Sequence, residues 1–116
     1  MAEHAFEIQK RRKGDVVVLD VAGNLTLGEG EQSFKETVLE ILDRKHNKIL
    51  VNLKDLDFMD SSGVGALVKS YTTVTQNGGR LKLLQPGKMV LQTLKITGLL
   101  GIFESFDDEA KAISSF

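Results

Sequence analysis

The sequence lacks cysteine and tryptophan, and it contains one proline, one tyrosine and two histidines. Without cysteine, the chain has no disulfide scaffold, no thiolate nucleophile and no zinc site built from thiolates. The two histidines, His4 and His46, are far apart and have no third partner at metal-ligand spacing, which excludes a histidine-based zinc site. These absences predict a protein with no metal and no resident cofactor, and they fit a reducing compartment.

An excess of charge of one sign is also missing, because 15 Lys and Arg residues stand against 16 Asp and Glu residues. A dedicated nucleic-acid-binding domain carries a basic excess, so we expect no nucleic-acid partner. The first residues, Met1–His4, are polar and show no apolar stretch of a signal peptide. The most apolar run, Ile96–Phe103, falls far short of the roughly 20 residues that cross a bilayer. We therefore expect a cytoplasmic protein without membrane insertion.

What is present is the composition of a globular domain. The chain has 116 residues, of which 41% are hydrophobic and 27% are charged. This length and balance suit a single hydrophobic core. Residues 1–116 are therefore expected to form one domain.

The hydrophobic pattern alternates between the two periods that distinguish strands from helices. Strands are expected at Phe6–Ile8, Val16–Ala22, Lys48–Leu53, Arg80–Leu84 and Ile102–Phe103. Helices are expected at about Glu31–Lys45, from Ser61 to a turn at Asn77–Gly79, at Lys88–Ile96, and after Ser105 as an N-cap. Because Lys48–Leu53 is apolar on both faces, it should be central in the sheet. The order of elements predicts an α/β fold.

The charged segment Lys10–Asp15 is expected to be a hairpin turn between the first two strands. Its basic residues, Lys10–Lys13, could bind an anionic surface. A solvated turn is the simpler interpretation in a chain whose net charge is −1.

Three kinds of functional site can be tested against the centre of the chain. Asp55, Asp57 and Asp60 are closely spaced, but the glycine and the final glutamate of a calcium loop are missing. A nucleophile elbow at Ser61 or Ser62 would need a glycine two positions before the serine, and none stands there. A dinucleotide-binding loop would need a third glycine after Gly63 and Gly65. The sequence therefore predicts no catalytic residue and no enzyme.

Ser61 remains the most informative residue, since it lies where a buried strand gives way to a helix. As an N-cap it could stabilise that helix by about 1 kcal/mol. The free N–H groups and the dipole of a helix N-terminus also favour an anion. A phosphoryl group on Ser61 would therefore be compatible with the folded domain, which makes a regulatory serine the alternative interpretation.

The stretch Val51–Gly65 (VNLKDLDFMDSSGVG) resembles the signature of the anti-sigma factor antagonists, which belong to the STAS domain family. The turn Asn77–Gly79 and the segment Thr93–Leu99 (TLKITGL) are similar to later landmarks of that family. The resemblance implies that residues 1–116 form a single STAS domain, a small mixed β-sheet packed on one side by about four helices.

The resemblance also implies a function. An unphosphorylated antagonist of this kind binds an anti-sigma factor that is also a serine kinase, and so releases a sigma factor for transcription. Phosphorylation of the serine that follows the motif's Asp, here Ser61, switches it off, and a metal-dependent serine phosphatase reverses the modification. ATP and magnesium belong to these partners.

Two segments carry the partner-binding residues that the resemblance implies. One set is Asp60, Ser62, Gly63 and Gly65, and the other is Asn24, Leu25 and Thr26. The family usually has an acidic residue at the position of Thr26, so this chain presents a different charge in that loop.

Two other functions are alternatives for a chain of this kind. A STAS-domain accessory subunit of a membrane transporter would have the same fold. A two-component receiver domain would have similar length and element order, but it needs an acidic pair after its first buried strand and a lysine after its last. Here the corresponding strand carries only Asp20. The antagonist interpretation accounts for the central motif best.

Overall fold

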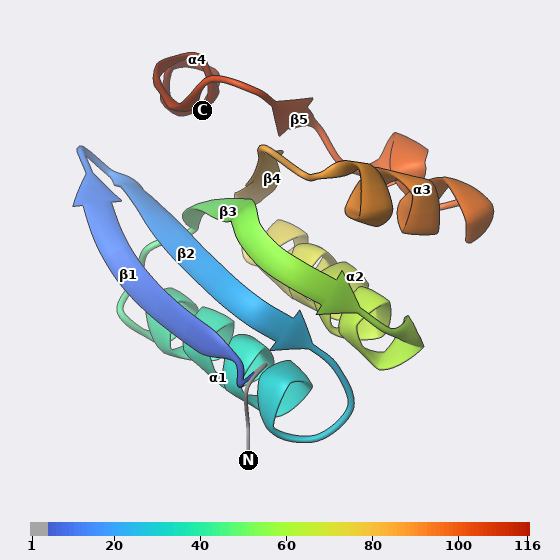
Figure 1. Cartoon of the computed structure of the whole chain (residues 1–116). Coiled ribbons are helices and arrows are strands. Elements are labelled where there is room, and N and C mark those ends of the chain that lie inside the picture. Colours follow the sequence, from blue (N-terminus) through green and yellow to red (C-terminus); the bar gives the residue numbers. More distant parts are fainter. Residues whose placement is uncertain (1–4) are drawn as a thin grey trace.

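The computed structural model describes residues 5–116, so His4 and the rest of the polar N-terminus lie outside the described residues. The strands are β1 (Glu7–Lys13), β2 (Val16–Leu25), β3 (Lys48–Met59), β4 (Arg80–Leu84) and β5 (Ser105–Phe106). The α-helices are α1 (Glu29–Asp43), α2 (Ser61–Gln76), α3 (Lys88–Ile96) and α4 (Glu109–Ser114), with a 3₁₀ turn at Leu100–Ile102. The predicted α/β fold is confirmed (Figure 1).

The strands form one sheet in the order β1-β2-β3-β4-β5. β1 pairs antiparallel with β2, and the remaining neighbours are parallel. As predicted, β3 is central, and its residues Ile49, Leu50 and Val51 are fully buried because both faces of the sheet are covered there.

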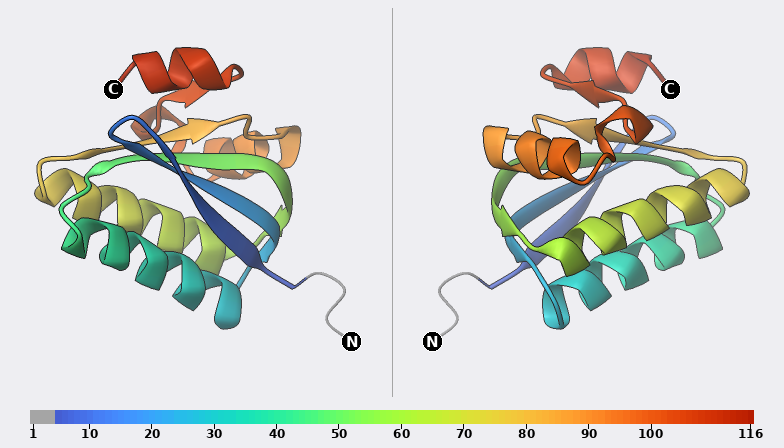
Figure 2. Two further views of the ribbon diagram at one scale, coloured as in Figure 1. Left: turned by 90° about the vertical axis from the view of Figure 1, so that its left-hand side faces the viewer. Right: turned by 90° about the vertical axis from the view of Figure 1, so that its right-hand side faces the viewer.

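Helices α1 and α2 cover one face of this sheet, and α4 lies on the opposite face (Figure 2). The larger core lies under α1 and α2 and includes Phe34, Ile49 and Leu67. A smaller core on the far face joins strand residues such as Val18 and Leu50 to Ala112 of α4. The expectation that helices pack on one side only is therefore wrong. The strand residues on the far face are apolar too, and α4 buries them.

Two local predictions in the β1–β2 hairpin are also wrong. Lys10–Lys13 belongs to β1, and the turn is confined to Gly14 and Asp15, because Gly14 supplies the left-handed backbone angle (φ +64°) that the tight turn requires. β2 continues through Gly23 and Asn24 to Leu25, and its register with β3 shifts between Gly23 and Asn24.

The C-terminal segment differs as well. Phe103 lies outside any strand and is buried against Tyr71, with ring centroids 5.2 Å apart in an edge-to-face arrangement. Ser105 lies in β5, and the side chain of Asp108 caps α4 by accepting a hydrogen bond from the Lys111 N–H (3.1 Å). Within residues 5–116, no helix combines the length and apolar character needed to cross a membrane.

Arg11 of β1 joins three elements on the far face of the sheet. Its guanidinium donates to Asp20 of β2 (2.9 Å from Nη2) and to Glu109 of α4 (2.8 Å from Nη2). Asn52 of β3 donates to the same Asp20 carboxylate (2.8 Å). The Arg11 hydrogen bonds hold the pKa of Asp20 and the pKa of Glu109 below their usual values, and partial burial opposes both shifts.

Because both carboxyl pKa values are depressed in the folded state, this network stabilises the fold above the unfolded pKa values, near pH 4, and is lost as the pH falls further. We expect Arg11→Gln to lower the free energy of unfolding by about 1 kcal/mol at pH 7, since all three side chains are about one-third exposed. Urea unfolding at pH 7 and pH 3 should show this difference shrinking in acid. Arg80→Gln, which removes an exposed charge elsewhere, is the control. An equal loss at both pH values would contradict the prediction.

Candidate functional site

The pairing of β2 with β3 brings the two predicted partner-binding segments together. The two strands are parallel, and Leu25 at the end of β2 lies opposite Met59 at the end of β3. The loop after β2 and the start of α2 therefore meet at the carboxyl edge of the sheet, where binding residues collect in α/β folds.

The carboxylate of Asp60 links these segments directly. Its Oδ1 accepts a hydrogen bond from the Gly63 N–H (2.9 Å), and its Oδ2 accepts one from the Leu27 N–H (3.1 Å). The first bond makes Asp60 the N-cap of α2, so Ser61 is the first residue of the helix and not its cap. One side chain thus fixes both the helix start and the loop after β2.

Gly63 allows the helix to approach the loop closely. A Cβ atom at this position would lie 2.0 Å from the Leu25 carbonyl oxygen and 2.7 Å from Met59 Cγ. The absent side chain, and not an unusual backbone angle, is therefore what the site requires here. Leu25 itself is 0% exposed, so its side chain supports this contact from within the core.

The other predicted site residues are accessible to different degrees. Ser61 and Gly65 are exposed, and Ser62 is half-buried. Asp60, Asn24 and Thr26 are also half-buried. The structure therefore places Ser61 at the outer surface of a site whose inner layer is formed by Leu25 and Gly63.

The N-terminus of α2 favours an added negative charge at Ser61, whereas the neighbouring carboxylate of Asp60 disfavours it. The first turn of α2 contains no acidic side chain, so its free N–H groups are not already paired with a carboxylate from within that turn. Both oxygens of the preceding Asp60 carboxylate are occupied by backbone donors. The helix N-terminus can therefore hold an anion at Ser61 without loss of the cap.

Two exposed apolar residues that the sequence motifs did not predict lie in the same neighbourhood. Leu27, in the loop after β2, is 72% exposed, and Phe58, near the end of β3, is 49% exposed. An apolar residue between Thr26 and Gly28 in a polar loop is the signal that could have identified Leu27. Large exposed apolar side chains near the start of α2 are suited to contact another protein.

The alternative chemistries find little support in the described part of the chain. Residues 5–116 contain no group of three or more His, Cys, Asp or Glu side chains placed to hold a metal ion. The carboxylate of Asp20 is engaged by Arg11. The buried Lys82 donates to the Ser115 carbonyl oxygen (2.8 Å) and forms an ion pair with Glu104 (3.3 Å). The acid pair and free lysine of a receiver domain are therefore not assembled here.

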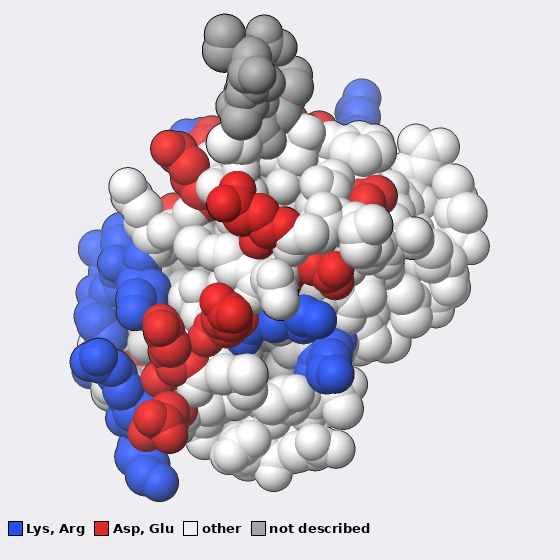
Figure 3. Space-filling view, turned by 90° about the horizontal axis from the view of Figure 1, so that it is seen from below, with Lys and Arg blue, Asp and Glu red and all other residues white. Residues whose placement is uncertain are grey.

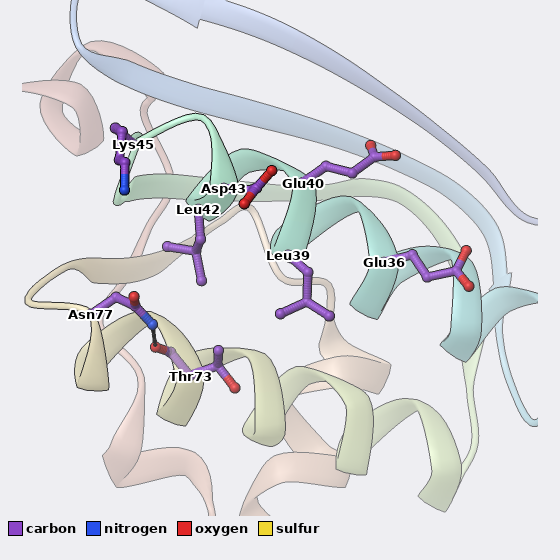
Figure 4. A pocket seen from close by; sticks show the side chains of 8 residues that line it. All are labelled: Glu36, Leu39, Glu40, Leu42, Asp43, Lys45, Thr73 and Asn77. Atoms are coloured by element: carbon purple, nitrogen blue, oxygen red, sulfur yellow. Dashed lines mark hydrogen bonds between the residues drawn. The ribbon is translucent and has the colours of Figure 1, made fainter.

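A separate groove of about 660 Å³ lies between the C-terminal parts of α1 and α2, at the opposite end of α2 from Ser61 (Figure 4). Leu39 and Leu42 point into the space between the two helices, and Asn77 donates to the Thr73 carbonyl oxygen (2.8 Å) across one turn. The groove shares no residue with the Ser61 site.

Comparison with known proteins agrees with this fold. The STAS domain model matches residues 7–112. A Thermotoga neapolitana protein described as a homologue of an anti-sigma factor antagonist is 34% identical over 100 residues, covering 85% of this chain and 88% of its own.

Solved structures of anti-sigma factor antagonists have the same fold as this chain. The anti-sigma factor antagonist SpoIIAA in its unphosphorylated form has a TM-score of 0.77 and 28% identity, covering 96% of this chain and 95% of its own. The Bacillus SpoIIAA structure in the phosphorylated form has a TM-score of 0.72 and 24% identity, covering 96% of this chain and 98% of its own. The chain therefore belongs to the STAS domain family and is similar to its members named anti-sigma factor antagonists.

Proposed function

We propose that this protein is an anti-sigma factor antagonist that is switched by phosphorylation of Ser61. In its unphosphorylated form it binds an anti-sigma factor with serine kinase activity, and so releases a sigma factor in the cytoplasm. The observation that carries the proposal is the exposed hydroxyl of Ser61 at the first position of α2, directly after the Asp60 cap. The similarity to SpoIIAA, which has been solved unphosphorylated and phosphorylated, supports it.

The docking surface in this proposal is centred on Ser61 and surrounded by accessible residues of both segments. Asn24, Thr26, Ser62 and Gly65 form its polar part, and Leu27 and Phe58 supply the apolar contacts. Leu25 and Gly63 support this surface from below. Because Thr26 stands where the family usually has an acidic residue, the loop presents no negative charge to the partner at this position.

The chain itself performs no chemistry in this proposal. The kinase supplies ATP and magnesium, and a metal-dependent serine phosphatase removes the phosphoryl group. Transfer breaks the bond between the γ-phosphorus and its bridging oxygen in ATP and forms a new bond to Ser61 Oγ, whose proton leaves with the kinase's base. Ser61 needs only to be accessible, and it is exposed.

The direct test locates the phosphate. We expect incubation with a cognate anti-sigma kinase and ATP to place phosphate on Ser61 in the wild type and in Ser62→Ala. Ser61→Ala should carry none. Peptide mass spectrometry after proteolysis distinguishes the two adjacent serines by fragment masses.

Phosphate on Ser62 in the wild-type protein would show that the acceptor is wrongly assigned. Absence of phosphate from every variant, with a kinase that modifies another antagonist in the same reaction, would instead favour a STAS-domain subunit of a membrane transporter.

A further inference from the structure

A small basic pocket lies at the other end of the sheet from Ser61. It has a volume of about 210 Å³ and is lined by Lys10, Arg12, Val17, Ile41, Arg44 and His46. Lys10 and Arg12 come from β1, whereas Arg44 and His46 follow the end of α1. Figure 3 shows Lys and Arg side chains gathered along the left-hand edge of the molecule, the side on which Figure 1 shows the β1–β2 hairpin.

The pocket combines fixed positive charge with an apolar floor. Lys10, Arg12 and Arg44 are cations at neutral pH, and the guanidinium fork of arginine matches the oxygens of a phosphate group. Val17 and Ile41, each 3% exposed, form the buried floor. Apolar walls keep water away from part of the site, which strengthens the attraction between these cations and an anion.

Arg12 and His46 are already held in place. The Arg12 guanidinium donates to the Gly14 carbonyl oxygen (3.2 Å), and its Nη1 lies 3.3 Å from His46 Nε2. Because arginine can only donate, Nε2 accepts in this contact, which leaves the Nδ1–H of a neutral imidazole as a further donor. Little side-chain freedom would be lost when an anion binds to these two residues.

Two features oppose an anion, and both are weakened by the local structure. The Glu40 carboxylate forms an ion pair with the lining residue Lys10 (3.7 Å), but its side chain is 64% exposed. The C-terminal carbonyl groups of α1 carry partial negative charge, but those of Glu40 and Leu42 accept bonds from the Arg44 N–H (3.1 Å) and the Lys45 N–H (2.9 Å). Within residues 5–116 the Arg44 side chain has no hydrogen-bond or ion-pair partner, so its charge remains available.

We propose that this pocket binds a phosphate group, carried either by a small phosphorylated molecule or by the headgroup of an anionic lipid. The volume is smaller than that of sites for drug-sized ligands, which start at about 300 Å³, so the pocket would enclose the phosphate and leave the rest of the ligand outside. This inference does not depend on the proposed switch at Ser61.

The first experiment uses inorganic pyrophosphate as the probe. We expect titration calorimetry at low ionic strength to detect its binding, and NMR spectra to show the largest amide shifts at Arg12, Arg44 and His46. Arg12→Gln and Arg44→Gln should each weaken binding at least tenfold, because each removes a charge-assisted hydrogen bond. Arg80→Gln makes the same change in net charge on β4, which is separated from β1 by two strands, and should bind as the wild type does. Glu40→Gln should bind more tightly.

The second experiment separates the two sources of the phosphate. Sedimentation with phosphatidylglycerol vesicles, and with phosphatidylcholine vesicles as the control, reports binding to a lipid surface. Pyrophosphate binding without vesicle binding assigns the site to small molecules. Vesicle binding that Arg12→Gln and Arg44→Gln abolish but Arg80→Gln does not assigns it to headgroups. Equal weakening in all three arginine variants, or no binding of either probe at millimolar concentration, would overturn the proposal.

Discussion

Gly63→Ala is expected to lower the free energy of unfolding by about 3 kcal/mol. The new methyl group would lie 2.0 Å from the Leu25 carbonyl oxygen, well inside van der Waals contact, and the contacting atom belongs to the backbone. Either the start of α2 or the end of β2 must shift, and overpacking of this kind costs about 1–3 kcal/mol or more. The hydrogen bond between Asp60 and the Gly63 N–H would be disturbed at the same time. Urea unfolding measures the loss.

Gly65→Ala is the matched control two residues later in the same helix. A Cβ atom at Gly65 would meet nothing within 4 Å. Replacing glycine by alanine inside a helix usually stabilises it by about 0.5–1 kcal/mol. The two glycine variants should therefore change stability in opposite directions. If Gly63→Ala were as stable as the wild type, the contact between α2 and Leu25 would not be as close as described.

The second large effect concerns partner binding. Under the proposed function, Ser61→Asp should weaken binding to the anti-sigma factor by roughly a hundredfold, which corresponds to about 2.7 kcal/mol. The added charge would lie beside the Asp60 carboxylate and would have to lose water when the interface forms. A negative charge at the first position of a helix does not destabilise the free protein, so thermal unfolding should be unchanged or slightly improved.

Ser61→Asn, which has nearly the same size but no charge, separates the electrostatic effect from a steric one. We expect it to bind the partner within a few-fold of the wild type. Calorimetric titration of each variant with the purified anti-sigma factor gives the affinities. Equal weakening by Asn and Asp would indicate that size, and not charge, controls docking at Ser61.

The regular elements of this fold are largely predictable from the sequence because their hydrophobic patterns are strong. The apolar face that predicted the helix from Ser61 is the face that packs on the sheet, with Val64, Leu67 and Val74 buried. The central position of β3 followed from its apolar residues on both faces. Local periodicity was sufficient in these cases because burial follows it directly.

Contacts between distant residues explain where the sequence was insufficient. Lys10–Lys13 is polar on both sides, a pattern that predicts a turn, whereas pairing with β2 makes it an edge strand. Asp108 caps α4, although Ser105 is an equally good cap by residue type. The ends of these elements depend on strand pairing and on the packing of Phe103 against Tyr71. Neither contact can be deduced from the composition of a short segment.

The candidate site, too, is only partly predictable from the sequence. The motif Asp60–Gly65 could be recognised as the start of a helix from its residue types alone. The parallel register of β2 and β3 explains why the Leu27 N–H reaches Asp60, and no short sequence window contains that register. Leu25 was expected to contact a partner because of its place in the loop, but a strand continuing to this residue buries its side chain.

The two edge strands of the sheet affect whether copies of this protein associate with each other at high concentration. Unpaired strand edges invite further strands and can lead to aggregation. Here one edge is β1, whose Lys and Arg side chains repel an identical strand, and the other is β5, which spans only Ser105–Phe106. Neither edge offers a long, uncharged template. Sheet extension between copies is therefore disfavoured.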